Sequence, residues 1–495
     1  MAGKFRNFSG SGDHCRSRAG ILFTGLVCIF LVELCVMIYH SGVMAESNEE
    51  AGAWRKAAME ECDRRTVTMG NITDRNGQVL LEFEKPAAVD RGTYIDDYAY
   101  SNVIGYYAQN SFGLLRKYAK VLQKTPTLDD TRGSSLTLTL DHELQMAVYE
   151  VLKEAIGDEG RGSMVVMDAE TGEILSMVSL PTFNVSDLNR EMEWMSKDTD
   201  VWYPLATVGD LAPGSTFKVL SSIVLLENGM EKHTEKDSEF QAGGHTIHNY
   251  YEGTGKKIDY REALSVSSNI FFAKSILSIE NAAEKLTEAA GRLYIGTDLE
   301  LDFGPVTSNW SLNEDTLEAL RGYETFNMDY VLASTSFGQS EVRFSAMNGA
   351  MLAAAVMNDG KLITPYMIEA ITDCRGKTVA PDSLDVEGLS GAHGTLLSQV
   401  TSAEIAGKIR SAMQEAAEQS YGFDPALHVA AKSGTAESGM KGNAGNSAWM
   451  ISGAEINGHK YAVAINWANA GKGIIGSYMK KPVEKIYRVL EQSAE

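Results

Sequence analysis

The chain has 495 residues and a formal net charge of −22 at pH 7, with 66 acidic side chains against 44 basic ones. This length predicts two or more domains, and a hydrophobic content of 44% is enough for a large buried core. The acidic balance argues against nucleic acid as a partner, because a phosphate backbone demands a basic surface.

The first residues differ from the rest of the chain. Residues 20–39 form a mostly apolar run that is long enough to span a bilayer as a transmembrane anchor. Basic residues precede the run and acidic residues follow it, so we expect residues 1–19 to be cytoplasmic and the remainder extracytoplasmic. A cleaved signal peptide ending near Ala45 is the alternative. Glu33, inside the run, either faces a partner transmembrane helix or is tolerated by the bilayer.

Residues 40–158 are expected to form a stalk and a small N-terminal module. Residues 41–61 are acidic and rich in alanine, which predicts a helical stalk, and residues 62–135 mix short strands with polar turns. Apolar residues recur at helical spacing over residues 141–155, which predicts a linking helix. Of the five cysteines, only Cys62 and Cys374 lie beyond the anchor, in different predicted domains, so the sequence gives no argument for a bridge between them.

Residues 159–495 carry strands at both ends and helices between them. Apolar strands at residues 164–167 and 174–178 flank a turn and predict one hairpin. Strands at 448–451 and 461–465 flank Asn457 and Gly458 and predict a second hairpin, with 432–435 as a neighbouring strand. We expect residues 205–420 to be largely helical and residues 482–491 to form a terminal helix. Together these elements predict an α+β fold.

The most informative stretch of the chain surrounds Ser215 and Lys218. Pro213 and Gly214 precede them, which suits a turn entering a helix, and an apolar helix follows. Residues three apart share a helical face, so the amine of Lys218 can lie beside the hydroxyl of Ser215. A serine nucleophile needs such a base in contact. The pattern alone also fits a polar helix start followed by a surface lysine.

Two further motifs follow in order, residues 267–269 and residues 432–435. Serine-x-x-lysine, serine-x-asparagine and lysine-x-glycine segments occur together in enzymes that transfer acyl groups through a serine. Ser267 and Asn269 could instead cap a helix, and residues 432–435 could be a plain strand. Three ordered matches nevertheless make serine acyl transfer the leading hypothesis. His245 and His248 have no evident third ligand, so neither a metal nor a cofactor is predicted.

With these motifs the chain resembles the class B penicillin-binding proteins, which are membrane-anchored serine D,D-transpeptidases of peptidoglycan synthesis. The resemblance extends to residues 74–77, 136–145, 337–339 and 353–360. The chain departs from the family at Met69, where the family usually carries an arginine. The resemblance implies a penicillin-binding transpeptidase domain with an antiparallel sheet flanked by helices, preceded by a dimerisation or pedestal-like module and one transmembrane helix.

The resemblance also implies a role for each motif residue. Ser215 is the nucleophile, Lys218 its base and Ser267 a proton relay to the leaving amine. The backbone N–H groups of Ser215 and Thr435 form the oxyanion hole that a tetrahedral intermediate needs. A second cation near Lys218 would favour its neutral form, and the resemblance places such a cation in the same cleft. The implied substrate-binding residues are Asn269, Lys432, Ser433, Gly434 and Thr435.

The implied function is the cross-linking of stem peptides. Ser215 would attack the D-Ala-D-Ala bond and an acceptor amine would resolve the acyl-enzyme, while β-lactams would acylate Ser215 as substrate mimics. The family implies a membrane glycosyltransferase as partner. Two alternatives remain open. Water could resolve the acyl-enzyme, in a D,D-carboxypeptidase or a β-lactam hydrolase built on the same motifs, or the protein could be a non-catalytic scaffold of the wall-synthesis machinery.

Overall fold

The computed structural model describes Glu33 and residues 66–492, apart from residues 109–110, 128, 158–159, 197–198, 438–444 and 472. The chain divides into two compact units, Met1–Val67 and Thr68–Glu495, and the second holds both five-stranded sheets and the helices around them. Within the described residues no helix has the length and apolar character needed to cross a membrane. The predicted cytoplasmic segment, anchor and stalk lie outside the described residues, except for Glu33. Cys62 also lies outside them, whereas Cys374 is exposed with a free thiol.

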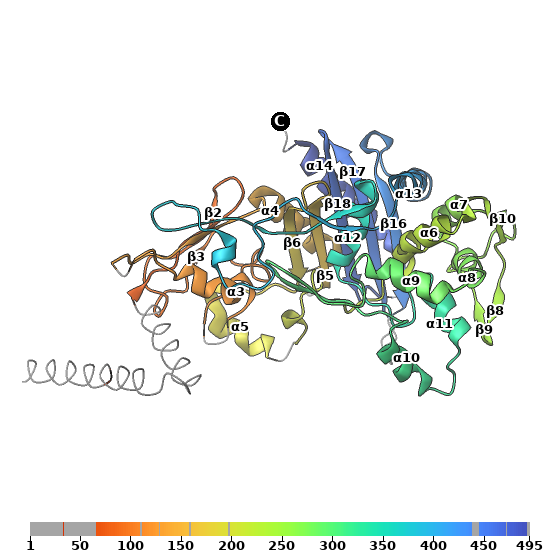
Figure 1. The fold of residues 1–495 in the computed structure, drawn as a ribbon, viewed down its shortest axis with the longest axis horizontal. Helices are drawn as coiled ribbons and strands as arrows, with labels where there is room; N and C mark the ends of the chain where they lie inside the picture. Colours follow the sequence, from red (N-terminus) through yellow and green to blue (C-terminus); the bar gives the residue numbers. More distant parts are fainter. Residues whose placement is uncertain are drawn as a thin grey trace, which may run out of the picture. The chain divides into compact units, whose positions relative to one another are not determined.

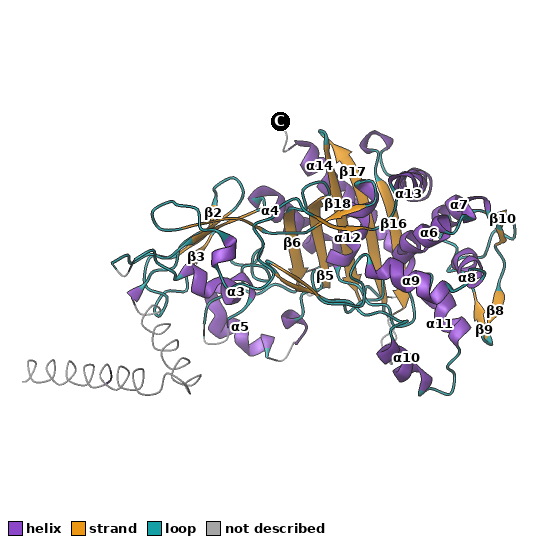
Figure 2. Cartoon of the chain, in the orientation of Figure 1, coloured by secondary structure: helices purple, strands orange, loops and turns teal. Residues whose placement is uncertain are grey.

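A five-stranded antiparallel sheet forms the centre of the second unit, in the order β16-β17-β18-β5-β6 (Figures 1 and 2). Its strands are β5 (Arg161–Asp168), β6 (Ile174–Leu180), β16 (Ala430–Glu437), β17 (Asn446–Ile456) and β18 (His459–Ala468). Both predicted hairpins are therefore confirmed. The second turns at Asn457 and Gly458, whose φ angles of 53° and 84° suit an Asn-Gly turn.

Helices cover both faces of this sheet. Helix α12 (Ala346–Met357) packs on β5, β17 and β18, with α13 (Ala403–Ala416) and α6 (Lys218–Glu227) beside it. Helices α4 (His142–Ile156) and α14 (Lys480–Gln492) contact each other and pack on β5, β6 and β17. Every residue of α12 is buried, as expected of a helix that is apolar on all sides. The predicted antiparallel sheet flanked by helices is confirmed.

Residues 205–420 were expected to be largely helical, but they also contain short strands. The further helices of this segment are α7 (Tyr260–Ser265), α8 (Asn269–Leu277), α9 (Ala282–Gly291), α10 (Glu314–Arg321) and α11 (Met328–Thr335). Its strand pairs are β7 (Glu235–Lys236) with β10 (Lys257–Ile258), β8 (Phe240–Ala242) with β9 (His245–Ile247), β11 (Leu299–Leu301) with β12 (Gly304–Val306), and β13 (Lys361–Ile363) with β15 (Leu396–Gln399). Strands this short carry too few residues to show an alternating pattern.

A second sheet has the order β14-β4-β1-β2-β3. Its strands are β1 (Ile72–Thr73), β2 (Val79–Glu82), β3 (Thr93–Tyr94), β4 (Ser135–Leu138) and β14 (Ile368–Thr372). Two further helices are α3 (Gly113–Leu122) and α5 (Leu188–Met195). Met69 is fully buried near this sheet, and Arg132 donates hydrogen bonds to the carbonyl oxygens of Met69 and Phe83. The small module thus receives its edge strand, β14, from a distant part of the chain.

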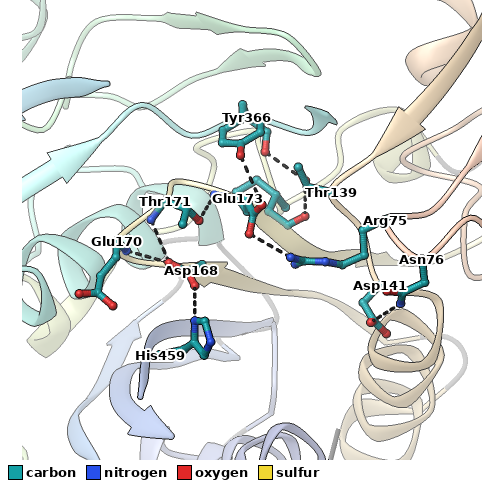
Figure 3. Close-up of polar contacts among 11 residues, drawn as sticks. Arg75, Asn76, Thr139, Asp141, Asp168, Glu170, Thr171, Glu173, Tyr366 and His459 are labelled. Carbon is teal, nitrogen blue, oxygen red and sulfur yellow. Dashed lines mark hydrogen bonds and ion pairs between the residues drawn. The ribbon is translucent and has the colours of Figure 1, made fainter. Parts of the chain in front are cut away.

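The turn at residues 74–77 joins the two sheets through polar contacts (Figure 3). The Asp74 carboxylate accepts the N–H groups of Asn76 and Gln78, which closes a tight turn with Gly77 at a φ of 83°. Arg75 then reaches Glu173, in the turn between β5 and β6, with Nη2 3.2 Å from Oε2. The segment that resembles a family signature therefore acts as a structural connection between the small module and the central sheet.

Candidate active site

Ser215 lies in a 3-10 turn, Gly214–Phe217, that runs directly into α6. Gly214 has a φ of 53°, and its N–H donates to the carbonyl oxygen of Gly338 at 3.0 Å. A Cβ at Gly214 would lie 2.6 Å from the carbonyl oxygen of Thr435, so glycine lets the turn approach β16 closely. Side chains three residues apart eclipse in a 3-10 turn, and Lys218 Nζ accordingly lies 2.8 Å from Ser215 Oγ.

Residues 267–269 bring a second hydroxyl to Lys218. Ser267 has a left-handed φ of 58°, and its carbonyl oxygen and Oγ lie 2.6 Å and 3.2 Å from Lys218 Nζ. Such a backbone conformation is uncommon for serine and concentrates at functional sites. The cap of α8 is Ser268, whose Oγ accepts the N–H of Phe271 at 2.9 Å, rather than Ser267 or Asn269. Ser267 is therefore left to face the cleft.

Strand β16 supplies the third motif. The Nζ of Lys432 donates to Ser267 Oγ at 3.0 Å, to the carbonyl oxygen of Ser433 at 3.0 Å and to the Tyr421 hydroxyl at 3.1 Å. An unbroken chain of polar contacts thus runs from Ser215 through Lys218 and Ser267 to Lys432. The structure brings the three motifs, which lie far apart in the sequence, into hydrogen-bond contact.

The environment of Lys218 favours an uncharged amine. The side chain is completely buried, and burial followed by the nearby ammonium of Lys432 lowers the pKa of Lys218 well below its usual value, while Asp237 acts in the opposite direction. A neutral amine can donate both N–H groups to Ser267 and still accept the Ser215 hydroxyl proton on its lone pair. The geometry suits a base that activates Ser215.

The remaining residues of the third motif line or support the cleft. Thr435 faces it, and the Thr435 Oγ1 accepts the N–H of Gly476 at 3.0 Å. Ser433 also lines it. Gly434 does not border the cleft, and a Cβ there would lie 2.4 Å from the carbonyl oxygen of Pro213. Gly434 therefore allows the turn that carries Ser215 to pack closely against β16.

Backbone N–H groups point from β16 toward the same side. Strand β16 is an edge strand, and the N–H of Ser433 points away from the sheet, to the Tyr421 hydroxyl at 3.2 Å. Donors alternate along an antiparallel strand, so the N–H of Thr435, two residues on, points outward as well. The predicted oxyanion hole of Ser215 and Thr435 N–H groups is consistent with this arrangement and stays a prediction.

The cleft has a volume of about 830 Å³ and is lined by Ser215, Ser267, Asn269, Ser433 and Thr435, among others. Its outer wall is aromatic. The His245 ring stacks on Tyr330 with centroids 4.0 Å apart, and the exposed rings of Tyr250, Tyr251 and Tyr323 stand nearby. No group of three or more His, Cys, Asp and Glu side chains suited to a metal occurs in the described part of the chain.

Asn269 is held by polar residues between positions 237 and 249, which the sequence analysis did not identify. The Asn269 side-chain amide donates to the carbonyl oxygen of His248 at 3.0 Å, and its backbone N–H donates to Asn249 Oδ1 at 2.7 Å. Asp237 accepts the Ser268 hydroxyl at 2.6 Å and the Asn249 amide at 2.9 Å. Burial raises the pKa of Asp237, but the hydrogen bonds from Ser268 and Thr254 more than offset it, so the pKa lies below its usual value.

Tyr421 is the other residue that the sequence did not point to. It lies 11 residues before Lys432, and the phenol contacts that ammonium directly. Asp237 lies 31 residues before Ser268. Neither pair lies within one helix or one strand, so no spacing rule links these residues to the motifs.

Comparisons with known proteins agree with this geometry. A family model described as the penicillin binding protein transpeptidase domain matches residues 162–489. A peptidoglycan D,D-transpeptidase PbpA of Mycolicibacterium smegmatis is 26% identical over 405 residues, covering 75% of this chain and 78% of the relative. A peptidoglycan D,D-transpeptidase MrdA of Acinetobacter baumannii is 25% identical over 439 residues, covering 78% of this chain and 61% of the relative.

Solved structures share the fold. The D,D-transpeptidase domain of a peptidoglycan glycosyltransferase from Eggerthella lenta superposes with a TM-score of 0.72 at 23% identity, covering 87% of this chain and 99% of that one. Penicillin-binding protein A from M. tuberculosis, as a ceftriaxone acyl-enzyme complex, gives a TM-score of 0.72 at 21% identity, covering 86% and 99%. With a family model that spans most of residues 68–495, this chain belongs to the penicillin-binding protein transpeptidase family.

Proposed function

We propose that this protein is a peptidoglycan D,D-transpeptidase that works through an acyl-enzyme on Ser215. The observation that carries the proposal is the contact chain from Ser215 Oγ to Lys218 Nζ, Ser267 Oγ and Lys432 Nζ around a fully buried lysine. A nucleophile, a base with a depressed pKa and a proton path are thereby held within hydrogen-bond reach. The names of the relatives, which are peptidoglycan D,D-transpeptidases, support the same reaction.

The first half-reaction forms the acyl-enzyme. Neutral Lys218 takes the proton of the Ser215 hydroxyl as Oγ attacks the carbonyl carbon of the penultimate D-alanine. The N–H groups of Ser215 and Thr435 stabilise the negative oxygen of the tetrahedral intermediate. The proton then passes from Lys218 through Ser267 to the nitrogen of the terminal D-alanine, which leaves as the C–N bond breaks.

The second half-reaction transfers the acyl group to an amine. The acceptor amine of a neighbouring stem peptide attacks the ester carbonyl, gives up its proton along the same path, and Ser215 regains its hydroxyl. Asn269 orients the donor peptide from one wall of the cleft. The terminal carboxylate of the donor binds opposite, where Lys432 supplies positive charge and Ser433 and Thr435 supply hydroxyls. The N–H that Gly476 gives to Thr435 Oγ1 leaves the Thr435 hydroxyl proton available to that carboxylate.

The protein acts at the outer face of the cell membrane as a single-pass protein. The apolar run of residues 20–39, preceded by basic residues, anchors it there. The resemblance to class B penicillin-binding proteins implies a partner glycosyltransferase in the same membrane, which would supply the glycan strands.

Covalent labelling by a fluorescent penicillin tests the proposal. We expect the full-length protein to be labelled and Ser215→Ala to be unlabelled, because the bond forms at Ser215 Oγ. Ser222→Ala is the matched control, since Ser222 is a buried serine of α6, the helix that follows the turn of Ser215, and its hydroxyl donates to the carbonyl oxygen of Lys218. Equal labelling of wild type and Ser215→Ala, or none of either, contradicts the proposal. Loss of the label within seconds would identify a hydrolase instead.

A further inference from the structure

Tyr421 occupies a distinctive place beside the cleft. It ends a π-helical turn, Ala417–Tyr421, that continues α13, and Gly422 follows with a left-handed φ of 69°. Such turns are rare and occur frequently at functional sites. The neighbouring Ser420 Oγ donates to the carbonyl oxygen of Ser265 at 3.0 Å, which ties the turn to the end of α7 just before Ser267. Helix α13 itself packs on α7 and β16 (Figure 1).

Tyr421 completes the hydrogen bonding of the Lys432 ammonium. An ammonium has three N–H donors, and that of Lys432 has three acceptors, namely Ser267 Oγ, the Ser433 carbonyl and the Tyr421 hydroxyl. Lys432 is fully buried, so water does not replace a missing acceptor. The Tyr421 ring centroid also lies 5.8 Å from Lys432 Nζ, within the range of a cation–π contact.

The Tyr421 hydroxyl is itself fixed in orientation. It accepts the N–H of Ser433 at 3.2 Å as well as a proton from Lys432, so both of its lone pairs are occupied. Burial alone would raise the pKa of Tyr421, but the Lys432 ammonium and the hydrogen bonds of Ser433 and Lys432 hold it below its usual value. An oxygen held at both lone pairs cannot swing away from Lys432 without breaking two hydrogen bonds.

We propose that Tyr421 is a positioning residue for the proposed transpeptidase reaction, which holds the Lys432 ammonium against Ser267. The inference rests on the proposed function. Lys432 touches Ser267 Oγ, and Ser267 touches Lys218, so the place of the Lys432 charge determines how strongly it favours the neutral form of Lys218. Tyr421 acts on the reaction through these contacts and needs none with the reacting atoms.

This role has a signature in the pH dependence of acylation. The charged groups that face Lys218 are Lys432 from β16 and Asp237 from the loop before β8, and Tyr421 faces Lys432. Acylation by a neutral base rises with pH through the pKa of Lys218. Removing the Tyr421 hydroxyl frees Lys432 to move away, which raises the pKa of Lys218. The rising limb of the profile therefore moves to higher pH.

The test compares wild type, Tyr421→Phe and Tyr487→Phe in the full-length protein. The second-order rate constant for labelling by a fluorescent penicillin is measured from acidic to alkaline pH, with the midpoint of thermal unfolding. Tyr487 is the matched control, because its buried hydroxyl bonds Ser452 and it does not border the cleft. We expect Tyr421→Phe to slow labelling by about tenfold at neutral pH and to move the rising limb to higher pH. Tyr487→Phe should leave both unchanged.

The outcomes separate this inference from the proposed function. Wild type that takes no label contradicts the function itself. If wild type is labelled but the rising limb of the pH profile does not move in Tyr421→Phe, the proposed role of Tyr421 is wrong. This holds even if the labelling rate and the thermal midpoint of Tyr421→Phe both fall. Lys432→Met supplies a second variant. In a protein that already carries Lys432→Met, adding Tyr421→Phe should not slow labelling further. If Tyr421→Phe slows labelling by the same factor with and without Lys432→Met, Tyr421 acts independently of Lys432.

Discussion

At the scale of single residues, the cleft combines two buried amines, those of Lys218 and Lys432, whose surroundings differ. Lys432 has three acceptors for three N–H groups, which is the environment of an ammonium. Lys218 is just as buried, lies close to that positive charge, and has a strongly lowered pKa. The two amines therefore differ in their hydrogen bonding, although both are buried.

Asp237 provides a prediction at this scale. Its carboxylate accepts the Ser268 hydroxyl, the Asn249 amide and the N–H of Thr254, which hold residues 267–269 in place. In Asp237→Asn one oxygen becomes an NH₂ donor that faces other donors. We expect unfolding to become easier by about 2 kcal/mol and labelling to slow, because the left-handed Ser267 loses its support. Thermal unfolding and penicillin labelling measure the two effects.

Asp90→Asn is the comparison for that experiment. Asp90 likewise accepts three hydrogen bonds, from the backbone N–H groups of Glu84, Lys85 and Gly92, but it lies in the small module. We expect it to lower the thermal midpoint without slowing the labelling of folded protein. If Asp237→Asn labels at the wild-type rate, the loop does not depend on this carboxylate.

The sequence predicted the residues that we propose to react, and it missed the residues that support them. Ser215 and Lys218 follow a local spacing rule, because one helical turn brings them together. Asp237 and Tyr421 reach their partners only through tertiary packing, across 31 and 11 residues respectively. Their contacts depend on where a loop and a π-helical turn end, which local residue patterns do not encode.

At the scale of elements, the turn after β18 packs tightly on β16 and β17. Gly476, in the 3-10 turn Gly476–Met479, donates its N–H to Thr435 Oγ1. A Cβ there would lie 2.3 Å from the carbonyl oxygen of Gly434 and 2.6 Å from that of Trp449. Gly476→Ala should push the turn away from the strand, cost roughly 1–3 kcal/mol of stability and slow penicillin labelling.

Gly407→Ala is the matched control for that substitution. Gly407 lies within α13, and a Cβ there would meet no atom within 4 Å. Alanine is also the better helix former, so stability should stay constant or rise slightly while labelling is unchanged. The thermal midpoints and labelling rates of both variants test whether the close packing at Gly476 is needed. Normal labelling of Gly476→Ala would mean that the turn can move without disturbing Thr435.

The long elements were predictable from local patterns, and the short ones were not. β17 and β18 span 11 and 10 residues around an Asn-Gly turn, and their apolar runs identify them. β7 and β10 have two residues each, and their pairing depends on the packing of the surrounding loops. The expectation of a largely helical segment over residues 205–420 holds for α6 to α13 but missed the short strands for this reason.

At the scale of the whole molecule, Asp302 joins elements that are distant in sequence. Its carboxylate accepts the N–H groups of Met367 and Ile368, at the start of β14, and its carbonyl oxygen accepts the Tyr118 hydroxyl of α3. Burial raises the pKa of Asp302 to about 6, despite the backbone hydrogen bonds that favour its charged form. We therefore expect the junction between the small module and the catalytic region to be sensitive to pH.

The sign of this dependence can be predicted. A carboxyl whose folded-state pKa is raised stabilises the fold fully below its unfolded-state pKa, about 3.8, and loses that contribution as pH rises through about 6. Relative to Asp302→Asn, wild type should lose about 3 kcal/mol of unfolding free energy over this range. Thermal or urea unfolding of both proteins across the range measures the difference. If the unfolding free energy of wild type stays constant or rises with pH relative to that of Asp302→Asn, the prediction is wrong.

Strand β14 has a consequence for how such a protein can evolve. The strand lies within the stretch matched by the transpeptidase family, yet it pairs with β4 of the small sheet, with Ile368 opposite Leu138 and Ile371 opposite Leu136. Recombination that exchanged the small module for that of a relative would have to reproduce this register, or leave an open, aggregation-prone edge. We therefore expect the small sheet and the transpeptidase domain to be exchanged together, because β14 belongs to the matched stretch and completes the small sheet.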